Sequence, residues 1–270
     1  MIPKIIHYCW FGRNPKPKLA LKCIASWKKY CPDYEIIEWN EDNFDISACP
    51  LYVRQAYEAK KWAFVTDYVR LNVVYDHGGL YFDTDVELIR HPDELLEHSA
   101  YFGFEGGPFV NTGLGFGAEK NAEILRELMA DYEGIPFVLQ NGEYDVTSCT
   151  ERNAGVFKRY GLICNRETQM LEGNIQILAP EWLCPYDDWS GEKRITQNTV
   201  SIHWYSASWQ TQEYVQRKRE AVKANTKARY KKNMRKALYS IRYFPNRVLM
   251  ILLGEQKYTS LKKKIKGKTK

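Results

Sequence analysis

The chain has 270 residues, of which 44% are hydrophobic and 14% aromatic, enough for one large domain or two small ones with a real core. Seven cysteines, an odd number without a CxxC pair, argue against a disulfide framework or a structural zinc site and fit a reducing cytoplasm. The longest apolar run, residues 248–253, is too short to span a membrane. The first four residues lead straight into a strand-like run and lack the pattern of a signal peptide.

Charge divides the chain into an acidic body and a basic tail. The net charge is +6, from 39 Lys and Arg against 33 Asp and Glu. Residues 211–270 hold 19 Lys and Arg and three acids, a net of +16, which leaves 20 bases and 30 acids, a net of −10, on residues 1–210. This asymmetry is typical of a globular body with an arm that meets an anionic surface. We therefore expect a domain over residues 1–210 and a basic helical tail over 211–270.

Strand-like and helix-like segments alternate along the body. Strands are expected, in chain order, at residues 4–10, 34–39, 80–82, 101–104, 114–116, 175–178 and 199–204. Helices are expected at residues 19–30, 51–60, 63–76 and 122–132. The alternation predicts an α/β fold with a mostly parallel sheet and flanking helices.

The sharpest chemical signal is a pair of acids, Asp83 and Asp85, directly after the short apolar strand at residues 80–82. Ligands of open α/β sheets bind where the strands end, and residues two apart in a strand share a face. Two close carboxylates repel each other, and a hard cation such as Mg²⁺ or Mn²⁺ removes that repulsion. Alone, a DxD is more often a solvated turn, but the apolar strand and the glycines Gly78 and Gly79 before it favour a metal site.

A second signal precedes the first on the most apolar helix. Asp67 and Arg70 are three residues apart on the helix expected at residues 63–76, so they share a face. They form either a surface ion pair, worth a few tenths of a kcal/mol, or a binding pair in which Arg70 meets a phosphate and Asp67 accepts from sugar hydroxyls.

Two further segments combine histidine with aromatic residues. His7 and Trp10 lie at the end of the first strand, where Trp10 is either core or a ring that stacks on a nucleobase. His203, Ser208 and Trp209 follow the last strand, where His203 is either a structural hydrogen-bonding residue or a late metal or phosphate ligand. We take all five as candidate ligand contacts.

These segments together resemble a known family, the DXD-containing sugar transferases. That family includes bacterial capsule and exopolysaccharide glycosyltransferases and the fungal initiating mannosyltransferases, and the catalytic domain of the clostridial glucosylating toxins is a more distant likeness. The matching pieces, in order, are Ile2-Pro3-Lys4-Ile5-Ile6-His7, Trp10-Phe11-Gly12, Ala63, Asp67, Arg70, Gly78-Gly79-Leu80-Tyr81, Asp83-Thr84-Asp85, His203 and Ser208-Trp209.

The resemblance implies a GT-A-like fold, a nucleotide-diphosphate-sugar donor, Mn²⁺ or Mg²⁺ as cofactor, and retention of the anomeric configuration. It implies that Trp10 stacks on the base and that Asp67 and Arg70 contact the donor sugar and phosphate. It further implies that Asp83 contacts the donor and that Asp85 binds the metal directly. Of the two common donor classes, a UDP-sugar is favoured over a GDP-sugar, and the acceptor is expected to be a glycan or a lipid-linked glycan.

The same resemblance assigns the end of the body to the diphosphate. His203, a candidate third metal ligand, closes over it together with Ser208 and Trp209. One departure is that many relatives carry Thr-Gly-Pro before a late helix, where this chain has residues 147–150, Thr-Ser-Cys-Thr. We find no nucleophile for a double displacement, although Asn111 and Glu105 lie where an acceptor-side group could come from.

Three other classes of protein compete with this interpretation. A DxD phosphatase of the haloacid dehalogenase type needs Thr or Val two residues after the second acid, where this chain has Glu87. A nucleic-acid-binding protein could use the 12 Lys and Arg between residues 217 and 247, but the body is acidic and carries no known nucleic-acid motif. A non-enzymatic sugar-binding module would not explain the two acids together with Asp67 and Arg70.

The tail leaves two alternatives open. It is either a solvated basic helix with a Lys-rich end or a peripheral arm at the inner face of the membrane. The apolar residues Tyr243, Phe244 and 248–253, beside Arg242, Arg247 and Lys262–Lys264, favour the arm.

Overall fold

The computed structural model describes residues 1–206, 212–254, 257 and 259–260. It divides into two compact units. The first comprises Met1–Asp188 and Glu192–Gln216, and the second comprises Trp189–Gly191 and Arg217–Lys270. The first unit holds the sheet and the candidate site, and the second holds most of a long basic helix.

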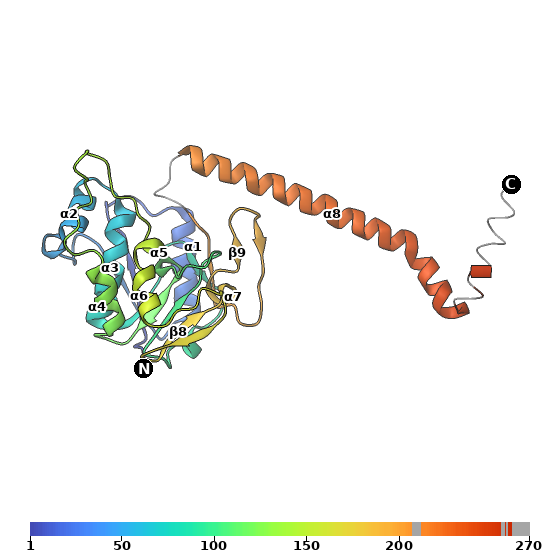
Figure 1. Cartoon of the computed structure of the whole chain (residues 1–270), viewed down its shortest axis with the longest axis horizontal. Helices are drawn as coiled ribbons and strands as arrows, with labels where there is room; N and C mark the ends of the chain where they lie inside the picture. The colour runs from blue at the N-terminus through green and yellow to red at the C-terminus, as the bar shows by residue number, and fades with distance from the viewer. Residues whose placement is uncertain (207–211, 255–256, 258, 261–270) are drawn as a thin grey trace. The chain divides into compact units, whose positions relative to one another are not determined.

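A seven-stranded sheet forms the centre of the first unit, in the order β2-β1-β3-β6-β5-β8-β7 (Figure 1). The strands are β1 (Ile5–Cys9), β2 (Glu35–Trp39), β3 (Gly79–Tyr81), β5 (Ala100–Gly103), β6 (Phe116–Ala118), β7 (Gln169–Leu171) and β8 (Ile175–Leu178). The pairings make β6 and β7 antiparallel to the other five strands. The predicted α/β fold with a mostly parallel sheet is therefore confirmed.

Helices cover both faces of this sheet. They are α1 (Lys18–Tyr30), α2 (Leu51–Glu58), α3 (Trp62–His77), α4 (Glu123–Ala130), α5 (Cys149–Arg152), α6 (Ala154–Arg159) and α7 (Pro180–Leu183), with short 3₁₀ turns at Ile46–Ala48, Asp93–Leu95 and Thr112–Leu114. Neighbouring strand residues point to opposite faces: Leu80 packs with Trp27 of α1, whereas Tyr81 packs with the core that contains Val69 of α3. Two apolar clusters thus sandwich the sheet.

Paired glycines connect the most buried helix to the central strand. Gly78 ends α3 with a φ of 68°, and Gly79 begins β3 with a φ of 108°. A Cβ on Gly79 would lie 2.7 Å from the carbonyl oxygen of Ile5 on β1. Only glycine combines this backbone conformation with so close an approach, which is why α3 can turn directly into a strand beside β1.

Two small two-stranded sheets complete the first unit and change some expectations. β4 (Val86–Leu88) pairs antiparallel with β11 (Ser201–His203), and β9 (Tyr186–Asp187) pairs with β10 (Glu192–Lys193). The strand expected at residues 114–116 was placed wrongly, because a 3₁₀ turn ends at Leu114 and Gly115 has a φ of 107° before β6 begins.

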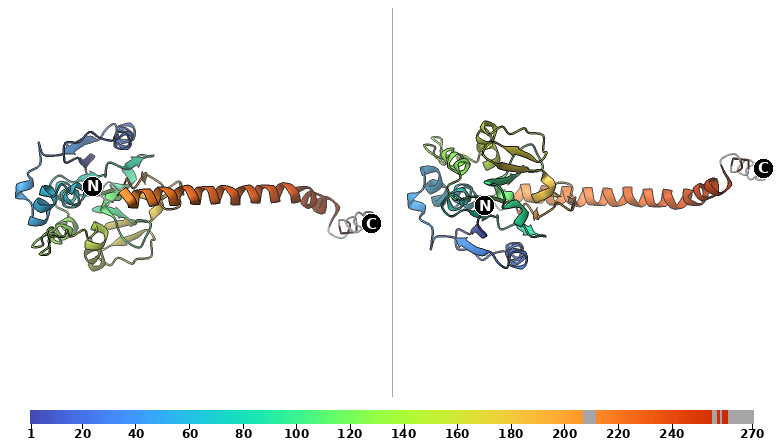
Figure 2. Two further views of the ribbon diagram at one scale, coloured as in Figure 1. Left: turned by 90° about the horizontal axis from the view of Figure 1, so that it is seen from above. Right: turned by 90° about the horizontal axis from the view of Figure 1, so that it is seen from below.

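The second unit is built on helix α8 (Gln212–Leu253), which begins in the last residues of the first (Figure 2). Residues 212–253 of the expected tail are therefore helical. Asn225 Nδ2 donates to the carbonyl of Trp189 at 3.0 Å, and Arg229 Nη2 donates to that of Gly191 at 3.4 Å. None of the helices in the described ranges has both the length and the apolarity required to cross a membrane.

Candidate functional site

The two acids of the DxD motif lie on a tight turn between β3 and β4. The strand ends at Tyr81, and the Val86 amide donates to the Asp83 carbonyl at 2.9 Å. The strand expected at residues 80–82 ends one residue earlier, and the chain turns between the two acids that follow it. The turn still brings both carboxylates to one place, at the end of β3 where a ligand is expected.

Asp85 faces His203, which is far away in the sequence, at the end of β11. The antiparallel pairing of β4 with β11 places His203 opposite Val86, and His203 Nε2 lies 3.3 Å from Asp85 Oδ1. The Ser206 amide donates to Asp85 Oδ2 at 2.7 Å. Burial would raise the pKa of Asp85, but His203 and the Ser206 amide outweigh it and hold that pKa well below its usual range. Asp85 is thus a carboxylate, not a neutral acid.

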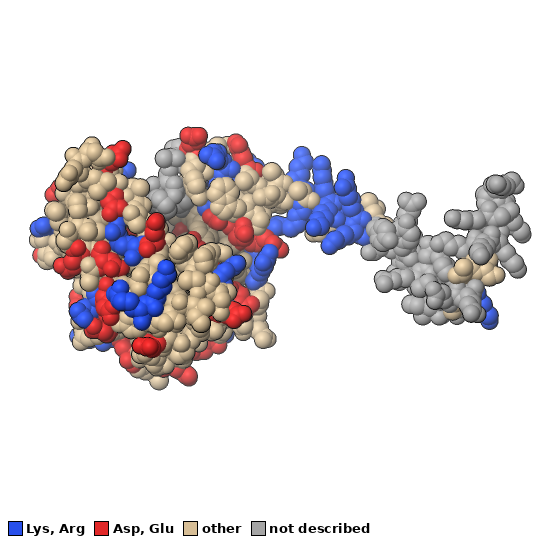
Figure 3. Space-filling view, in the orientation of Figure 1, with Lys and Arg blue, Asp and Glu red and all other residues tan. Residues whose placement is uncertain are grey.

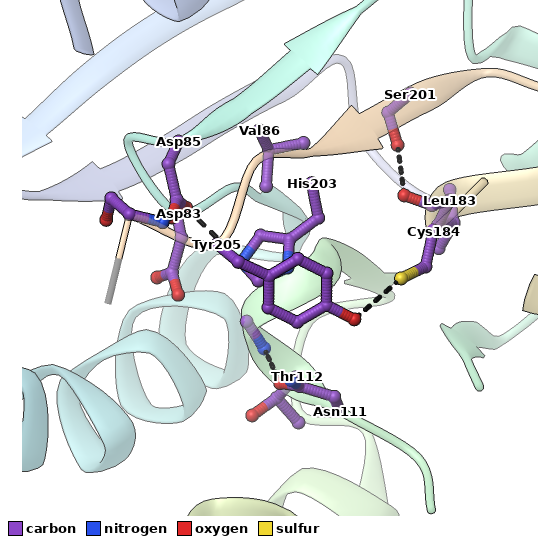
Figure 4. Close-up of polar contacts among 12 residues, drawn as sticks. Asp83, Asp85, Val86, Asn111, Thr112, Leu183, Cys184, Ser201, His203 and Tyr205 are labelled. Atoms are coloured by element: carbon purple, nitrogen blue, oxygen red, sulfur yellow. Dashed lines mark hydrogen bonds and ion pairs between the residues drawn. The ribbon is translucent and has the colours of Figure 1, made fainter. Parts of the chain in front are cut away.

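The three predicted metal ligands come together. Asp83, Asp85 and His203 each offer a ligand atom, and these atoms all lie within 4.8 Å of one another. Figure 4 shows the two carboxylates and the imidazole gathered on one side of the Tyr205 ring. Burial lowers the pKa of His203, but the neighbouring Asp85 carboxylate outweighs it and the net direction is upward.

Asp83 joins this group to the charged pair on α3. The Tyr81 hydroxyl donates to Asp83 Oδ1 at 2.8 Å, and Arg70 Nη2 lies 3.5 Å from the same oxygen. Burial raises the pKa of Asp83, opposed by the positive charge of Arg70 and reinforced by the negative charge of Asp85. A cation placed between the two acids would relieve this repulsion.

Asp67 and Arg70 form a buried pair, so the surface ion-pair alternative is wrong. Arg70 Nη2 lies 2.8 Å from Asp67 Oδ1, and the two residues are only 4% and 8% exposed. Burial raises the pKa of Asp67 to about 6, against the opposing charge of Arg70. Arg70 Nε also donates to the Thr66 carbonyl at 3.1 Å, which fixes the guanidinium beside Asp83.

The loop of residues 111–113 lies against Arg70 and Asp83 and forms one wall of the site. Asn111 Oδ1 accepts from the Gly113 amide at 2.6 Å, and Arg70 Nη1 donates to the Thr112 hydroxyl at 3.4 Å. A Cβ on Gly113 would lie 2.7 Å from Asp83 Oδ2, so a larger residue there would displace that carboxylate. The signal that could have found this loop is the Asn-Thr-Gly sequence, since Asn readily caps a short turn.

Cys149, the first residue of α5, lies in the segment that departs from the family's Thr-Gly-Pro pattern. Its Sγ donates to Asn111 Oδ1 at 3.8 Å. Burial and the neighbouring Asp67 raise the pKa of this thiol to about 12, so it stays protonated and acts as a weak hydrogen-bond donor. α3, the Asn111–Gly113 loop and α5 therefore meet around the Asp67–Arg70 pair.

Tyr205 holds the chain that follows β11 against the site. Its ring centroid lies 4.2 Å from that of His203, and its hydroxyl is 2.9 Å from Cys184 Sγ (Figure 4). Its φ is 51°, a left-handed conformation that is uncommon for a non-glycine residue. This bend brings the next residue, Ser206, onto Asp85. The predicted contacts Ser208 and Trp209 lie outside the described residues.

The structure separates the two candidates on the first strand. Trp10 is half-buried, and its Nε1 donates to the Asn14 carbonyl at 2.7 Å, so part of its ring remains open. His7 is fully buried: its Nε2 is 2.8 Å from the Gly78 carbonyl, and Trp39 Nε1 donates to its Nδ1 at 3.0 Å. Burial lowers the pKa of His7 to about 4. His7 is therefore a neutral ring that links β1, β2 and the end of α3, and it is not brought to the acids.

The residues of this site can together hold a cation and an anionic ligand. Three potential cation ligands lie beside one buried arginine, so positive charge can gather where a diphosphate would carry negative charge. Asp67 adds an acceptor for hydroxyl groups at the same wall. A half-buried tryptophan stands at the end of β1, a neighbour of the strand that leads to the acids.

Comparison with known proteins agrees with this chemistry. Residues 17–102 match the family described as a glycosyltransferase sugar-binding region containing a DXD motif. Among curated proteins, inositol phosphoceramide mannosyltransferase 3 of Schizosaccharomyces pombe is 33% identical over 104 residues, which is 37% of this chain and 29% of that protein. Subversion of eukaryotic traffic protein A of Legionella pneumophila is 27% identical over 135 residues, 40% of this chain and 20% of that protein. The chain thus spans less than a third of the length of either relative.

Two solved structures are similar at lower identity. The PaToxG glycosyltransferase aligns with a TM-score of 0.46 at 18% identity, over 58% of this chain and 69% of that one. A glycosyltransferase involved in the glycosylation of the major capsid of PBCV-1 aligns with a TM-score of 0.46 at 14% identity, over 81% and 98%. The resemblance found in the sequence is confirmed over residues 17–102, which match the sugar-binding region of the DXD-containing glycosyltransferases.

Proposed function

We propose that this protein is a metal-dependent glycosyltransferase that moves a sugar from a nucleotide-diphosphate-sugar to a glycan or lipid-linked acceptor. The observation that carries the proposal is the meeting of Asp83, Asp85 and His203 within 4.8 Å, beside the buried Arg70. A sugar-binding protein without activity has no need to concentrate positive charge next to a phosphate. A transferase does, because its leaving group gains negative charge as the sugar departs.

The donor set supports a divalent cation at this site. Carboxylate oxygens suit Mg²⁺ and Mn²⁺, and a neutral imidazole is a common further ligand. The Nδ1 atom of His203 is buried and has no hydrogen-bond partner among the described residues, so the ring is not tied to a structural role through that atom. When bound, the cation would neutralise charge on the donor diphosphate.

The remaining residues have separate roles in this proposal. Arg70, held by Thr66 and Asp67, meets the phosphate oxygens. Asp67 accepts hydrogen bonds from hydroxyls of the donor sugar, and Trp10 stacks on the base with the open part of its ring. Asn111 and the thiol of Cys149 extend the wall beside Asp67, where they limit the position of the sugar.

We further propose that transfer retains the anomeric configuration, as the resemblance implies. If the acceptor hydroxyl attacks on the face from which the diphosphate leaves, the departing phosphate oxygen accepts its proton and no strongly basic side chain is required. Asn111 and Glu105 are the acceptor-side groups that we assign to this step.

The proposal also covers the setting of the reaction. A UDP-sugar is the favoured donor, Mn²⁺ the favoured cation, and capsule or exopolysaccharide synthesis the favoured process. We place the reaction in the cytoplasm at the inner face of the membrane, since the tail is strongly basic and the acceptors of glycan assembly are often lipid-linked.

A panel of UDP-sugars and GDP-sugars, incubated with Mn²⁺, tests the function. We expect slow hydrolysis of one donor, with the released sugar first appearing as the anomer present in the donor. Asp85→Asn should abolish hydrolysis, whereas Asp76→Asn, at an exposed position near the end of α3, should leave it unchanged. Hydrolysis of no donor, or equal rates in the two variants, would refute the proposal.

A further inference from the structure

Helix α8 carries an exposed apolar stripe. Tyr230, Met234 and Leu238 are 66%, 44% and 59% exposed, although each is a large hydrophobic side chain. Residues four apart on a helix lie one above the other, so these three form a continuous line. Scattered hydrophobic residues are ordinary on a surface, but an aligned set indicates a contact.

The contact that α8 makes within its own unit leaves the stripe exposed. Asn225 and Arg229 donate to the backbone of Trp189–Gly191, and the Val222 side chain would lie 2.8 Å from a Cβ on Gly191. At about 100° per residue, Asn225 and Arg229 lie on another side of the helix from the stripe, whereas Val222 lies eight residues before Tyr230 on the same line. The contact with Gly191 therefore covers the start of this line, and Tyr230, Met234 and Leu238 continue it with exposed side chains.

Basic side chains surround the stripe. Residues 217–236 contain ten Lys and Arg and one acid, Glu220. Lys227 and Lys231 are exposed and lie three residues before Tyr230 and Met234, so they flank the stripe. Lys and Arg side chains gather along this part of the helix in Figure 3. The charge selects an anionic partner.

We propose that α8 binds lengthwise to an anionic lipid surface, with Tyr230, Met234 and Leu238 inserted among the headgroups and Lys227 and Lys231 against lipid phosphates. An apolar stripe edged by cations is the pattern of a helix that lies in a membrane interface. Nucleic-acid phosphates would pair with the cations but would leave the stripe in water. The inference rests on α8 alone, and it stands or falls independently of sugar transfer.

Vesicle sedimentation of the full-length protein tests the proposal. We expect binding to vesicles of phosphatidylcholine with phosphatidylglycerol, little binding to phosphatidylcholine alone, and weaker binding as salt rises. Replacing Tyr230, Met234 and Leu238 with Ser should weaken binding about tenfold or more. Circular dichroism checks that each variant keeps its helix.

Two charge-matched variants locate the contact on the helix. Lys227→Gln with Lys231→Gln removes two cations beside the stripe, whereas Lys232→Gln with Lys236→Gln removes two from the far side. The first pair should weaken vesicle binding about 25-fold more than the second, since each basic residue at the surface contributes about fivefold. Equal losses from both pairs, or full binding by the stripe variant, would overturn the proposal. Salt-sensitive binding to labelled DNA or RNA without vesicle binding would also overturn it, in favour of nucleic acid.

Discussion

Replacing Asp67 with Asn should stabilise the fold while it removes activity. Burial raises the pKa of this carboxyl to about 6, above the ordinary 3.8, so its ionised form is disfavoured in the folded protein. The difference corresponds to about 3 kcal/mol, nearly all of which acts at pH 7. Asn has the same shape and no charge, and Arg70 keeps Asp83 at 3.5 Å. We therefore expect Asp67→Asn to be about 1–3 kcal/mol more stable at pH 7.

Denaturant unfolding in EDTA, from pH 7 to pH 4, measures this effect without interference from a bound cation. The folded wild type takes up a proton at Asp67 as the pH falls through 6, and the unfolded chain does so only near 3.8. This group alone therefore makes the wild type more stable at lower pH, and Asp67→Asn should lack that gain. At pH 7 the variant should melt about 2–4 °C higher per kcal/mol gained. A variant less stable than the wild type at pH 7 would refute the reasoning, because the pairing with Arg70 would then outweigh burial.

Three other substitutions probe separate parts of the account. Trp10→Ala should raise the donor Kd about tenfold or more with little change in Tm, since stacking on a base is worth about 1–3 kcal/mol; unfolding at unchanged affinity would instead identify Trp10 as core. Burial lowers the pKa of His7 to about 4, so the folded protein loses about 3 kcal/mol of its free energy of unfolding as the pH falls from 6.5 to 4. His7→Gln should remove this loss of stability at low pH. An unchanged slope of the unfolding free energy against pH would contradict the assignment of His7 as a buried neutral ring. Gly113→Ala should lower kcat about tenfold or more by displacing Asp83, while Gly155→Ala, at a helix position with open space, should not; equal activities would exclude the steric argument.

The sequence predicted the parts of the site that local pattern controls. A short apolar strand after paired glycines and before two acids indicated β3 and the turn that follows it. The spacing of Asp67 and Arg70 indicated one helix face, and the structure brings them to 2.8 Å. Their burial could not be predicted, because it depends on helices and loops from other parts of the chain.

The misplaced and overlooked residues depend on contacts far apart in the sequence. His7 looks like a ligand in an aromatic segment, but its ring nitrogens contact Trp39 and Gly78, 32 and 71 residues away. Cys149 contacts Asn111, which lies 38 residues earlier in the chain, and the hydrophobic pattern of neither segment predicts this contact. The resemblance implied that His203 lies near the diphosphate, but the antiparallel pairing of β4 with β11 that brings it to Asp85 was not predicted.

The central claim is that a divalent cation at Asp83, Asp85 and His203 enables sugar transfer. Its most direct test is the rate of donor hydrolysis in excess EDTA and again after Mn²⁺ is restored. We predict that hydrolysis by the wild type stops in EDTA and returns with Mn²⁺, and that Asp85→Asn stays inactive in both conditions. Hydrolysis at the full rate in excess EDTA would contradict the account.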